Sequence, residues 1–185
     1  GTTDIAVFHD GIIQHTAIIP FGGNSITEDI KEGCMIMRNQ AERLKVKFGS
    51  ALPSESQENE IVCIPGLRGR EPKEISVRNL ASIISARMTE IIELVDYEII
   101  NSGLKKKLIG GIVVTGGGAQ LKHVKQLFEY VTGLDTRIGL PTEHLANTNE
   151  LDKLASPMYS TGIGLVLNGF NDLDRKGKIG ESATA

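Results

Sequence analysis

The chain opens with two short apolar runs separated by a turn signal. Residues 5–8 and 12–19 are rich in β-branched side chains, which favour extended strands. His9, Asp10 and Gly11 stand between them, and Asp and Gly are residues that tight turns prefer. We therefore expect a β-hairpin at the start of the chain.

Helical spacing follows the hairpin. Apolar side chains recur at steps of three and four, first at Ile26, Ile30 and Cys34 and then at Ala41, Leu44 and Phe48. This spacing predicts one helix capped by Asn24 or Ser25 and a second helix over residues 39–48. Residues 60–65 and 74–77 are expected to form two short strands.

The strongest pattern lies in the middle of the chain, from about Ser76 or Arg78 to a stop at residues 101–103. Its apolar positions are again separated by threes and fours: Leu80, Ile84, Met88, Ile91, Val95 and Ile99. Sustained over about five turns, this spacing predicts a long amphipathic helix.

The last third begins with a continuous apolar run over residues 108–115, which is typical of a strand buried on both faces. The elements expected after it are a glycine turn at 116–118, a helix over 121–131, a strand over 135–140 and a helix from Ser156 and Pro157 to Leu167. The remainder is polar, and we expect it to fray. This order of elements indicates an α/β half-fold that carries an inserted subdomain.

Composition narrows the class of protein. Hydrophobic residues make up 40% of the 185 residues, enough for a packed core, and the net charge of −3 disfavours a nucleic-acid-binding protein. Two cysteines, Cys34 and Cys63, are too few for a disulfide scaffold and fit a reducing compartment. No apolar run approaches the ~20 residues that a membrane span needs. Because Gly1 leads directly into a strand without an initiator Met, we expect a boundary within a longer protein.

The first candidate for chemistry is the segment Gly1, Thr2, Thr3 and Asp4 ahead of the first strand. Small side chains let a phosphate approach the backbone closely, and N–H groups and hydroxyls can donate to its oxygens. The alternative is an ordinary strand start with nothing bound.

A second candidate is the turn formed by Gly116, Gly117 and Gly118. Without side chains, this turn allows a nucleotide base or ribose to pack directly on the backbone. The segment matches neither the dinucleotide-binding pattern nor the P-loop pattern. A tight turn with only a structural role is the alternative.

Charged residues supply two further candidates. Glu42 and Lys45 are three residues apart and so share one helix face, where a carboxylate and an ammonium can contact a nucleoside. An ordinary solvated helix face is the alternative.

Five basic residues lie within residues 66–87, and only Glu71 and Glu74 oppose them there. They form a local positive patch that suits an acidic peptide, and ordinary surface charge is the alternative. These are Arg68, Arg70, Lys73, Arg78 and Arg87.

Taken in order, the segments GTTDIAVF, IPFGGN, AERLK, IVVTGGGA and YSTGIGL resemble the second half of an actin/Hsp70-type ATPase, and specifically the FtsA family of bacterial actin-like cell-division proteins. The resemblance covers roughly residues 1–170. It implies an α/β, actin-like (ribonuclease H-like) ATPase half-fold with a mixed sheet, flanking helices and an inserted α+β subdomain.

By this resemblance, residues 1–33 and 106–170 form subdomain 2A, residues 34–105 form subdomain 2B, and residues 171–185 form a flexible tail. The family's nucleotide-binding motifs fall on eight residues: Gly1, Thr2, Thr3, Glu42, Lys45, Gly116, Gly117 and Gly118. The family's partner-binding region falls on Lys73, Arg78 and Arg87. No catalytic or metal-ligating residue is assigned.

The resemblance also implies properties of the whole protein. It implies a scaffold that binds ATP with Mg²⁺, binds the acidic C-terminal peptide of the tubulin-like protein FtsZ, self-associates into actin-like filaments and lies in the cytoplasm against the inner face of the membrane at the division site. Membrane contact would come from a segment not visible here. We expect at most weak ATP hydrolysis by the full-length protein and little or no nucleotide binding by this piece alone.

Two alternatives remain open from the sequence. The chain could belong to another actin/Hsp70-fold ATPase, such as a pilus-assembly relative, a chaperone or a sugar kinase. It could also be a nucleotide-independent interaction module in which the glycine turn is only structural.

Overall fold

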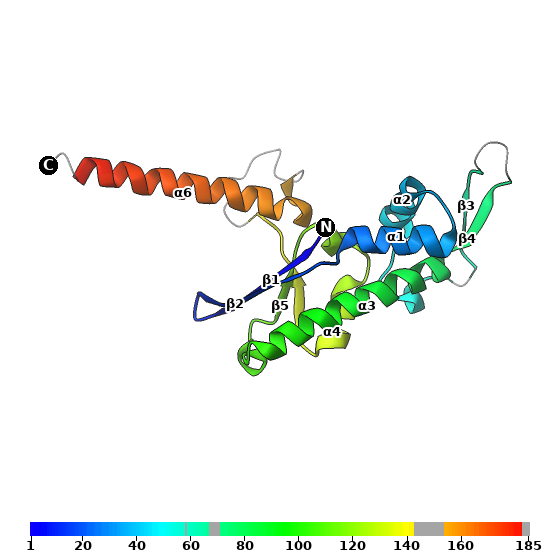
Figure 1. Ribbon diagram of the computed structural model, residues 1–185, viewed down its shortest axis with the longest axis horizontal. Coiled ribbons are helices and arrows are strands. Elements are labelled where there is room, and N and C mark those ends of the chain that lie inside the picture. The colour runs from blue at the N-terminus through cyan, green and yellow to red at the C-terminus, as the bar shows by residue number, and fades with distance from the viewer. Residues whose placement is uncertain (58, 67–70, 143–153, 183–185) are drawn as a thin grey trace. The chain divides into compact units, whose positions relative to one another are not determined.

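The computed structural model describes residues 1–57, 59–66, 71–142 and 154–182 (Figure 1). The chain divides into two compact units, one made of Gly1–Val113 with Leu121–Arg137 and the other of Val114–Gln120 with Ile138–Ala185. The predicted bounds of subdomains 2A and 2B stay a prediction.

The first unit opens with the predicted hairpin. Strands β1 (Thr3–His9) and β2 (Ile12–Ile19) pair antiparallel, with Thr3 opposite Ile19. Asp10 and Gly11 take positive φ angles of 53° and 74°, which are typical of a two-residue hairpin turn whose twist matches the strands. The sequence therefore located both strands and the turn correctly.

Two helices follow, α1 (Gly23–Cys34) and α2 (Arg38–Phe48). Most of the predicted apolar stripes are buried, at Ile26, Ile30, Cys34, Ala41 and Leu44. The predicted cap of α1 is wrong, because the helix begins after Gly22 rather than after Asn24 or Ser25. Ser25 instead accepts a hydrogen bond from the Gly22 N–H at 3.5 Å, so its hydroxyl stabilises the helix start from inside the first turn.

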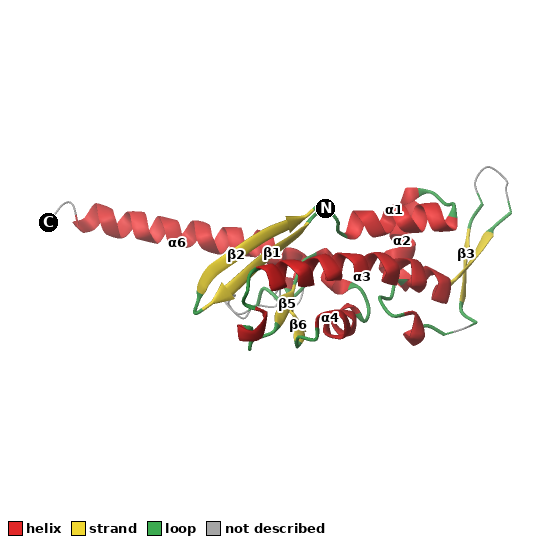
Figure 2. Ribbon diagram, turned by 60° about the horizontal axis from the view of Figure 1, so that its bottom comes forward, coloured by secondary structure: helices red, strands yellow, loops and turns green. Residues whose placement is uncertain are grey.

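The two predicted short strands are β3 (Ile61–Ile64) and β4 (Lys73–Ser76), which pair antiparallel. β4 leads into the long helix α3 (Val77–Asn101), whose N-cap is Ser76. All six apolar positions that predicted this helix are buried: Leu80, Ile84, Met88, Ile91, Val95 and Ile99. Figure 2 shows α3 running alongside both the hairpin and α1, so this helix is the central packing element of the first unit.

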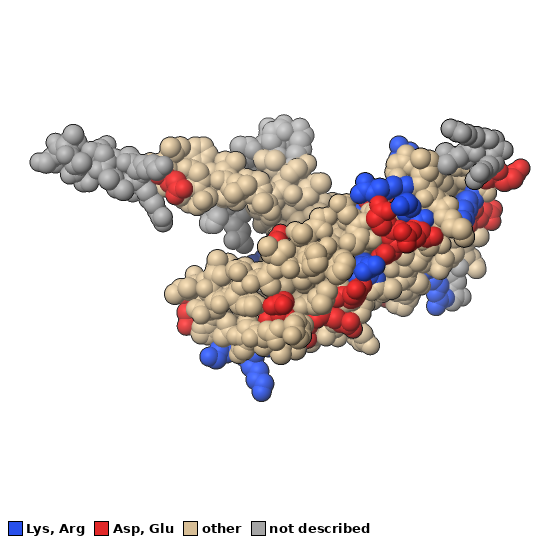
Figure 3. Space-filling model, in the orientation of Figure 1, with Lys and Arg blue, Asp and Glu red and all other residues tan. Residues whose placement is uncertain are grey.

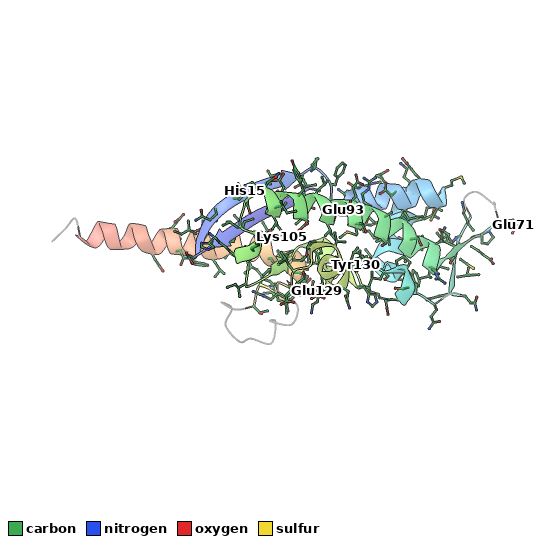
Figure 4. The ribbon with its side chains drawn as sticks, turned by 90° about the horizontal axis from the view of Figure 1, so that it is seen from below. His15, Glu71, Glu93, Lys105, Glu129 and Tyr130 are labelled. Carbon is green, nitrogen blue, oxygen red and sulfur yellow. The ribbon has the colours of Figure 1, made fainter. Side chains whose placement is uncertain are left out.

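A partly buried polar contact joins the hairpin to α3. His15 Nε2 on β2 lies 2.9 Å from Glu98 Oε2 on α3, and Figure 4 shows His15 where the hairpin passes this helix. Lys105, in the turn after α3, also pairs with the helix through Asp96 at 2.6 Å. Glu129 and Tyr130 lie on α4 (Val124–Thr132), which packs against α3 from another side.

The strand predicted over residues 108–115 is much shorter in the structure. Only β5 (Ile112–Val114) is extended, and it pairs with β6 (Thr136–Ile138). Burial on both faces was a wrong prediction, since Ile109 is 96% exposed and Val113 is 47% exposed. Gly111 takes a φ of 66°, which interrupts the extended run, and β6 is the one partner of β5 among the described residues.

The last helix is longer than predicted. A single 3-10 turn, Pro157–Tyr159, follows the N-cap Ser156 and leads into α6 (Ser160–Ser182). The predicted end at Leu167 is therefore wrong. The glycines beyond it each cost only about 1 kcal/mol, and no proline interrupts the helix. None of the described helices is long and apolar enough to cross a membrane.

Candidate functional site

The N-terminal segment is held by the loop that precedes α1. The Thr3 hydroxyl donates a hydrogen bond of 2.8 Å to the carbonyl of Phe21. A Cβ on Gly22 would lie 3.0 Å from the carbonyl oxygen of Gly1, closer than most real contacts allow. Gly22 is therefore needed for the close approach of the two backbones, which the sequence analysis did not recognise.

The same loop binds the Glu42 and Lys45 pair on α2. The Lys45 ammonium donates to the Gly23 carbonyl at 2.9 Å, to the Thr27 hydroxyl at 2.9 Å and to Glu42 Oε2 at 2.8 Å. An ammonium has three donors, so these bonds occupy all of them. Because this loop contacts both residues 1–3 and Lys45, the structure brings two of the predicted nucleotide-binding segments close together.

The carboxylate of Glu42 is kept ionised in this cluster. Partial burial raises its pKa, but hydrogen bonds from Lys45 and Thr27 outweigh burial and hold the pKa below its ordinary value. A charged carboxylate is a hydrogen-bond acceptor at neutral pH, as contact with ribose hydroxyls requires. Across the part of the chain that the structure describes, no three His, Cys, Asp or Glu side chains gather to hold a metal ion.

The glycine turn belongs to the second unit and is anchored at its base. The Gly116 N–H donates to the carbonyl of Pro157 at 2.9 Å, and the Thr115 hydroxyl lies 2.5 Å from the hydroxyl of Ser160. Gly116 takes a φ of 87°, which favours glycine. A Cβ built on Gly116, Gly117 or Gly118 would meet no heavy atom within 4 Å. The backbone of the turn is therefore open, as packing against a base requires.

One detail of this turn differs from expectation. Residues Gly117–Gln120 form a 3-10 turn, and α4 begins only at Val124, after His123 in a left-handed conformation. The helix predicted from residue 121 therefore starts later, because His123 with its φ of 61° cannot continue a right-handed helix. The N–H groups nearest the glycines are those of the 3-10 turn rather than of α4.

The predicted positive patch is partly neutralised. Arg87 on α3 binds Asp29 on α1 through two bonds, of 2.5 Å and 2.9 Å, and Glu90 at 2.6 Å. The hydrogen bonds that Arg87 donates to Asp29 raise the pKa of Arg87. Figure 3 shows acidic and basic side chains side by side on this face, where α1 and α3 meet. The guanidinium of Arg87 thus ties two helices together.

The other predicted partner-binding residues, Lys73 and Arg78, are exposed at the start of β4 and in the first turn of α3. Arg68 and Arg70 lie outside the described residues. Lys73 and Arg78 thus lie on β4 and α3, whereas Glu42 and Lys45 lie on α2.

Comparison with known proteins decides the family. The family model for the cell division protein FtsA matches residues 1–164. The chain belongs to the FtsA family. Cell division protein FtsA of Pseudomonas aeruginosa is 35% identical over 170 residues, which is 92% of this chain and 40% of that protein. The FtsA proteins of Borreliella burgdorferi and Bacillus subtilis are 41% and 35% identical over 90% of this chain, which corresponds to 40% and 36% of their own lengths.

Solved structures confirm the fold. MreB5 of Spiroplasma citri bound to AMPPNP matches 96% of this chain and 53% of its own chain, with a TM-score of 0.74 and 21% identity. The ethanolamine utilization protein EutJ of Carboxydothermus hydrogenoformans matches 89% of this chain and 44% of its own, with a TM-score of 0.53 and 20% identity. The predicted fold class and FtsA resemblance are thus confirmed, and this chain spans about two fifths of the FtsA relatives named above.

Proposed function

We propose that this FtsA-family chain is part of the second, ATP-binding half of an actin-like cell-division scaffold. The observation that carries the proposal is the set of hydrogen bonds that connects the N-terminal segment to Glu42 and Lys45 through the loop before α1. The open backbone at Gly117 supports it. The MreB5 relatives were solved with AMPPNP and with ADP, which fits nucleotide binding by this fold.

In this proposal each segment meets a different part of ATP. Gly1, Thr2 and Thr3 meet the phosphates, which arrive with Mg²⁺. Glu42 meets the ribose, and Gly116, Gly117 and Gly118 lie under the adenine. We assign no residue of this chain to catalysis, and we propose that hydrolysis by the full-length protein is weak at most.

The proposed partner is the acidic C-terminal peptide of the tubulin-like protein FtsZ. Lys73 and Arg78 offer exposed positive charge for it, and Arg87 lies further along the same helix as Arg78. We propose that the full-length protein binds this peptide, assembles into filaments and holds the division ring at the inner face of the cell membrane through a segment outside this chain.

The ATP site is tested by calorimetric titration of the full-length protein that carries this chain. Saturable ATP binding that is weakened by Lys45→Ala supports the proposal. Absence of ATP binding by a folded protein would contradict it and would favour an interaction module without nucleotide.

The peptide site is tested by titrating an acidic FtsZ-type C-terminal peptide at several salt concentrations. We expect the affinity to fall as salt screens the charges, and Lys73→Glu to weaken binding about fivefold or more. Arg87→Glu also places a carboxylate beside Asp29, so its melting temperature must be measured with its affinity. Equal peptide binding by Lys73→Glu, Arg78→Glu and the unaltered protein would reject the patch.

A further inference from the structure

Thr27 is the centre of the cluster around Glu42, although nothing in the sequence distinguishes it. Its side chain lies on α1 and is 0% exposed. The hydroxyl lies 2.5 Å from Glu42 Oε2 and 3.0 Å from the Gly23 carbonyl oxygen, and its one proton favours the shorter contact with the charged carboxylate. It accepts a hydrogen bond from the Lys45 ammonium at 2.9 Å. Thr27 therefore bonds both members of the pair that resemblance assigns to the nucleoside.

These bonds restrain one side of the Glu42 carboxylate. Thr27 and Lys45 both bond to Oε2, at 2.5 Å and 2.8 Å. Among the described residues, no hydrogen bond reaches Oε1, and the Glu42 side chain is 47% exposed. One carboxylate oxygen is thus committed to the protein, while the other is left as an oriented acceptor toward solvent.

Unlike Glu42, Lys45 has no polar group left to bond a ligand. Its three donors are used by Gly23, Thr27 and Glu42, and its side chain is 15% exposed. Binding a nucleoside through this ammonium would require breaking one of these bonds. Lys45 is therefore better suited to positioning Glu42 than to contacting the ligand.

We propose that Thr27 is a positioning residue that orients Glu42 so that Oε1 accepts a hydrogen bond from a ribose hydroxyl, and that the site thereby selects ribonucleotides over deoxyribonucleotides. This inference rests on the proposed ATP site. A buried hydroxyl that fixes the carboxylate before the ligand arrives lowers the ordering cost of binding. A sugar that lacks the bonded hydroxyl leaves the carboxylate without its partner and binds more weakly.

The test compares ATP with 2′-deoxyATP and 3′-deoxyATP on the full-length protein, by calorimetric titration. The unaltered protein should prefer ATP to at least one deoxy analogue by roughly tenfold, the worth of a hydrogen bond to a charged acceptor. Thr27→Val keeps the shape but removes the hydroxyl, and should reduce this preference about fivefold or more, through weaker ATP binding. Thr27→Ser keeps the hydroxyl and should retain the preference.

A matched control is Thr132→Val. Thr132 is also a buried helical threonine, and it donates to the Phe128 carbonyl at 2.7 Å, but it lies on α4 and outside the cluster. It should leave the preference unchanged. If Thr27→Val does not fold, Thr27→Ala gives the same readout.

The outcomes separate the two proposals. ATP binding with an equal preference in Thr27→Val and the unaltered protein would overturn the role of Thr27 while leaving the ATP site intact. Equal affinity of the unaltered protein for ATP and both deoxy analogues would overturn the selectivity. Failure of the unaltered protein to bind ATP at all would reject the proposed function itself.

Discussion

Replacing Gly117 with valine separates folding from nucleotide binding. A Cβ at this position meets no heavy atom within 4 Å, and Gly117 is not among the glycines with positive φ. The substitution therefore neither collides with the protein nor forces a strained backbone. Its effect on the free energy of unfolding should stay within about 0.5 kcal/mol, as for most surface changes.

The effect on ATP should be much larger. If adenine packs directly on the backbone of the glycine turn, valine places three carbon atoms where the ring would lie. Forcing additional methyl groups into a filled site costs about 1–3 kcal/mol. At 1.4 kcal/mol for each factor of ten, ATP affinity should fall about five- to 150-fold.

The assay is calorimetric titration of ATP into the full-length protein, with a thermal melt of each variant. Gly110→Val is the matched control, because a Cβ there also meets nothing within 4 Å and its φ is not positive. Unchanged ATP affinity in a folded Gly117→Val protein would refute the assignment of the turn to adenine. An equal loss of affinity in Gly110→Val would show that the effect is not local.

Three further predictions follow from contacts of the first unit. Gly111→Ala should lower the free energy of unfolding, measured in denaturant, by about 3 kcal/mol or more, because Gly111 has positive φ and an added Cβ collides with a backbone carbonyl. Gly110→Ala should have little effect, and similar unfolding of the two variants would contradict the prediction. Burial raises the pKa of the Cys34 thiol, so mass mapping of the native protein should find Cys63 alkylated well before Cys34, and equal rates would contradict the buried position. The pKa of Glu42 is lowered in the folded state, so the ionised carboxylate stabilises the protein at pH values above its unfolded pKa of about 4.5, and this stabilisation is lost as the pH falls through the lower, folded-state pKa. Glu42→Gln should therefore make the free energy of unfolding depend less on pH in the acid range. An unchanged acid dependence would contradict this prediction.

Much of the first unit could be predicted because local patterns decide it. The six apolar positions of α3 repeat at helical spacing, and each one is buried in the structure. The hairpin turn at Asp10 and Gly11 depends on residues that tolerate positive φ, so its conformation is largely a local property.

Other features depend on tertiary context. The apolar run before the glycine turn is only partly buried where a strand buried on both faces was predicted, because burial depends on which elements cover a strand rather than on its own composition. The end of α6 was missed since glycines weaken a helix without necessarily stopping it.

The sequence predicted the two charged residues of the candidate site but not the residues that hold them in place. Glu42 and Lys45 could be paired from their spacing, but Thr27 lies 15 residues from Glu42 along the chain. A threonine inside a helix carries no signal of its own, and only the approach of α1 to α2 gives it two charged partners. Gly22 became significant in the same way, through the proximity of Gly1.

The proposed contacts of ATP with the glycine turn and with the Glu42 cluster are tested most directly by amide hydrogen exchange of the full-length protein with and without saturating ATP and Mg²⁺. We expect slower exchange on ATP addition in both segments, at residues 116–120 and at residues 21–27. Bound ATP that leaves exchange at residues 116–120 unchanged would contradict it.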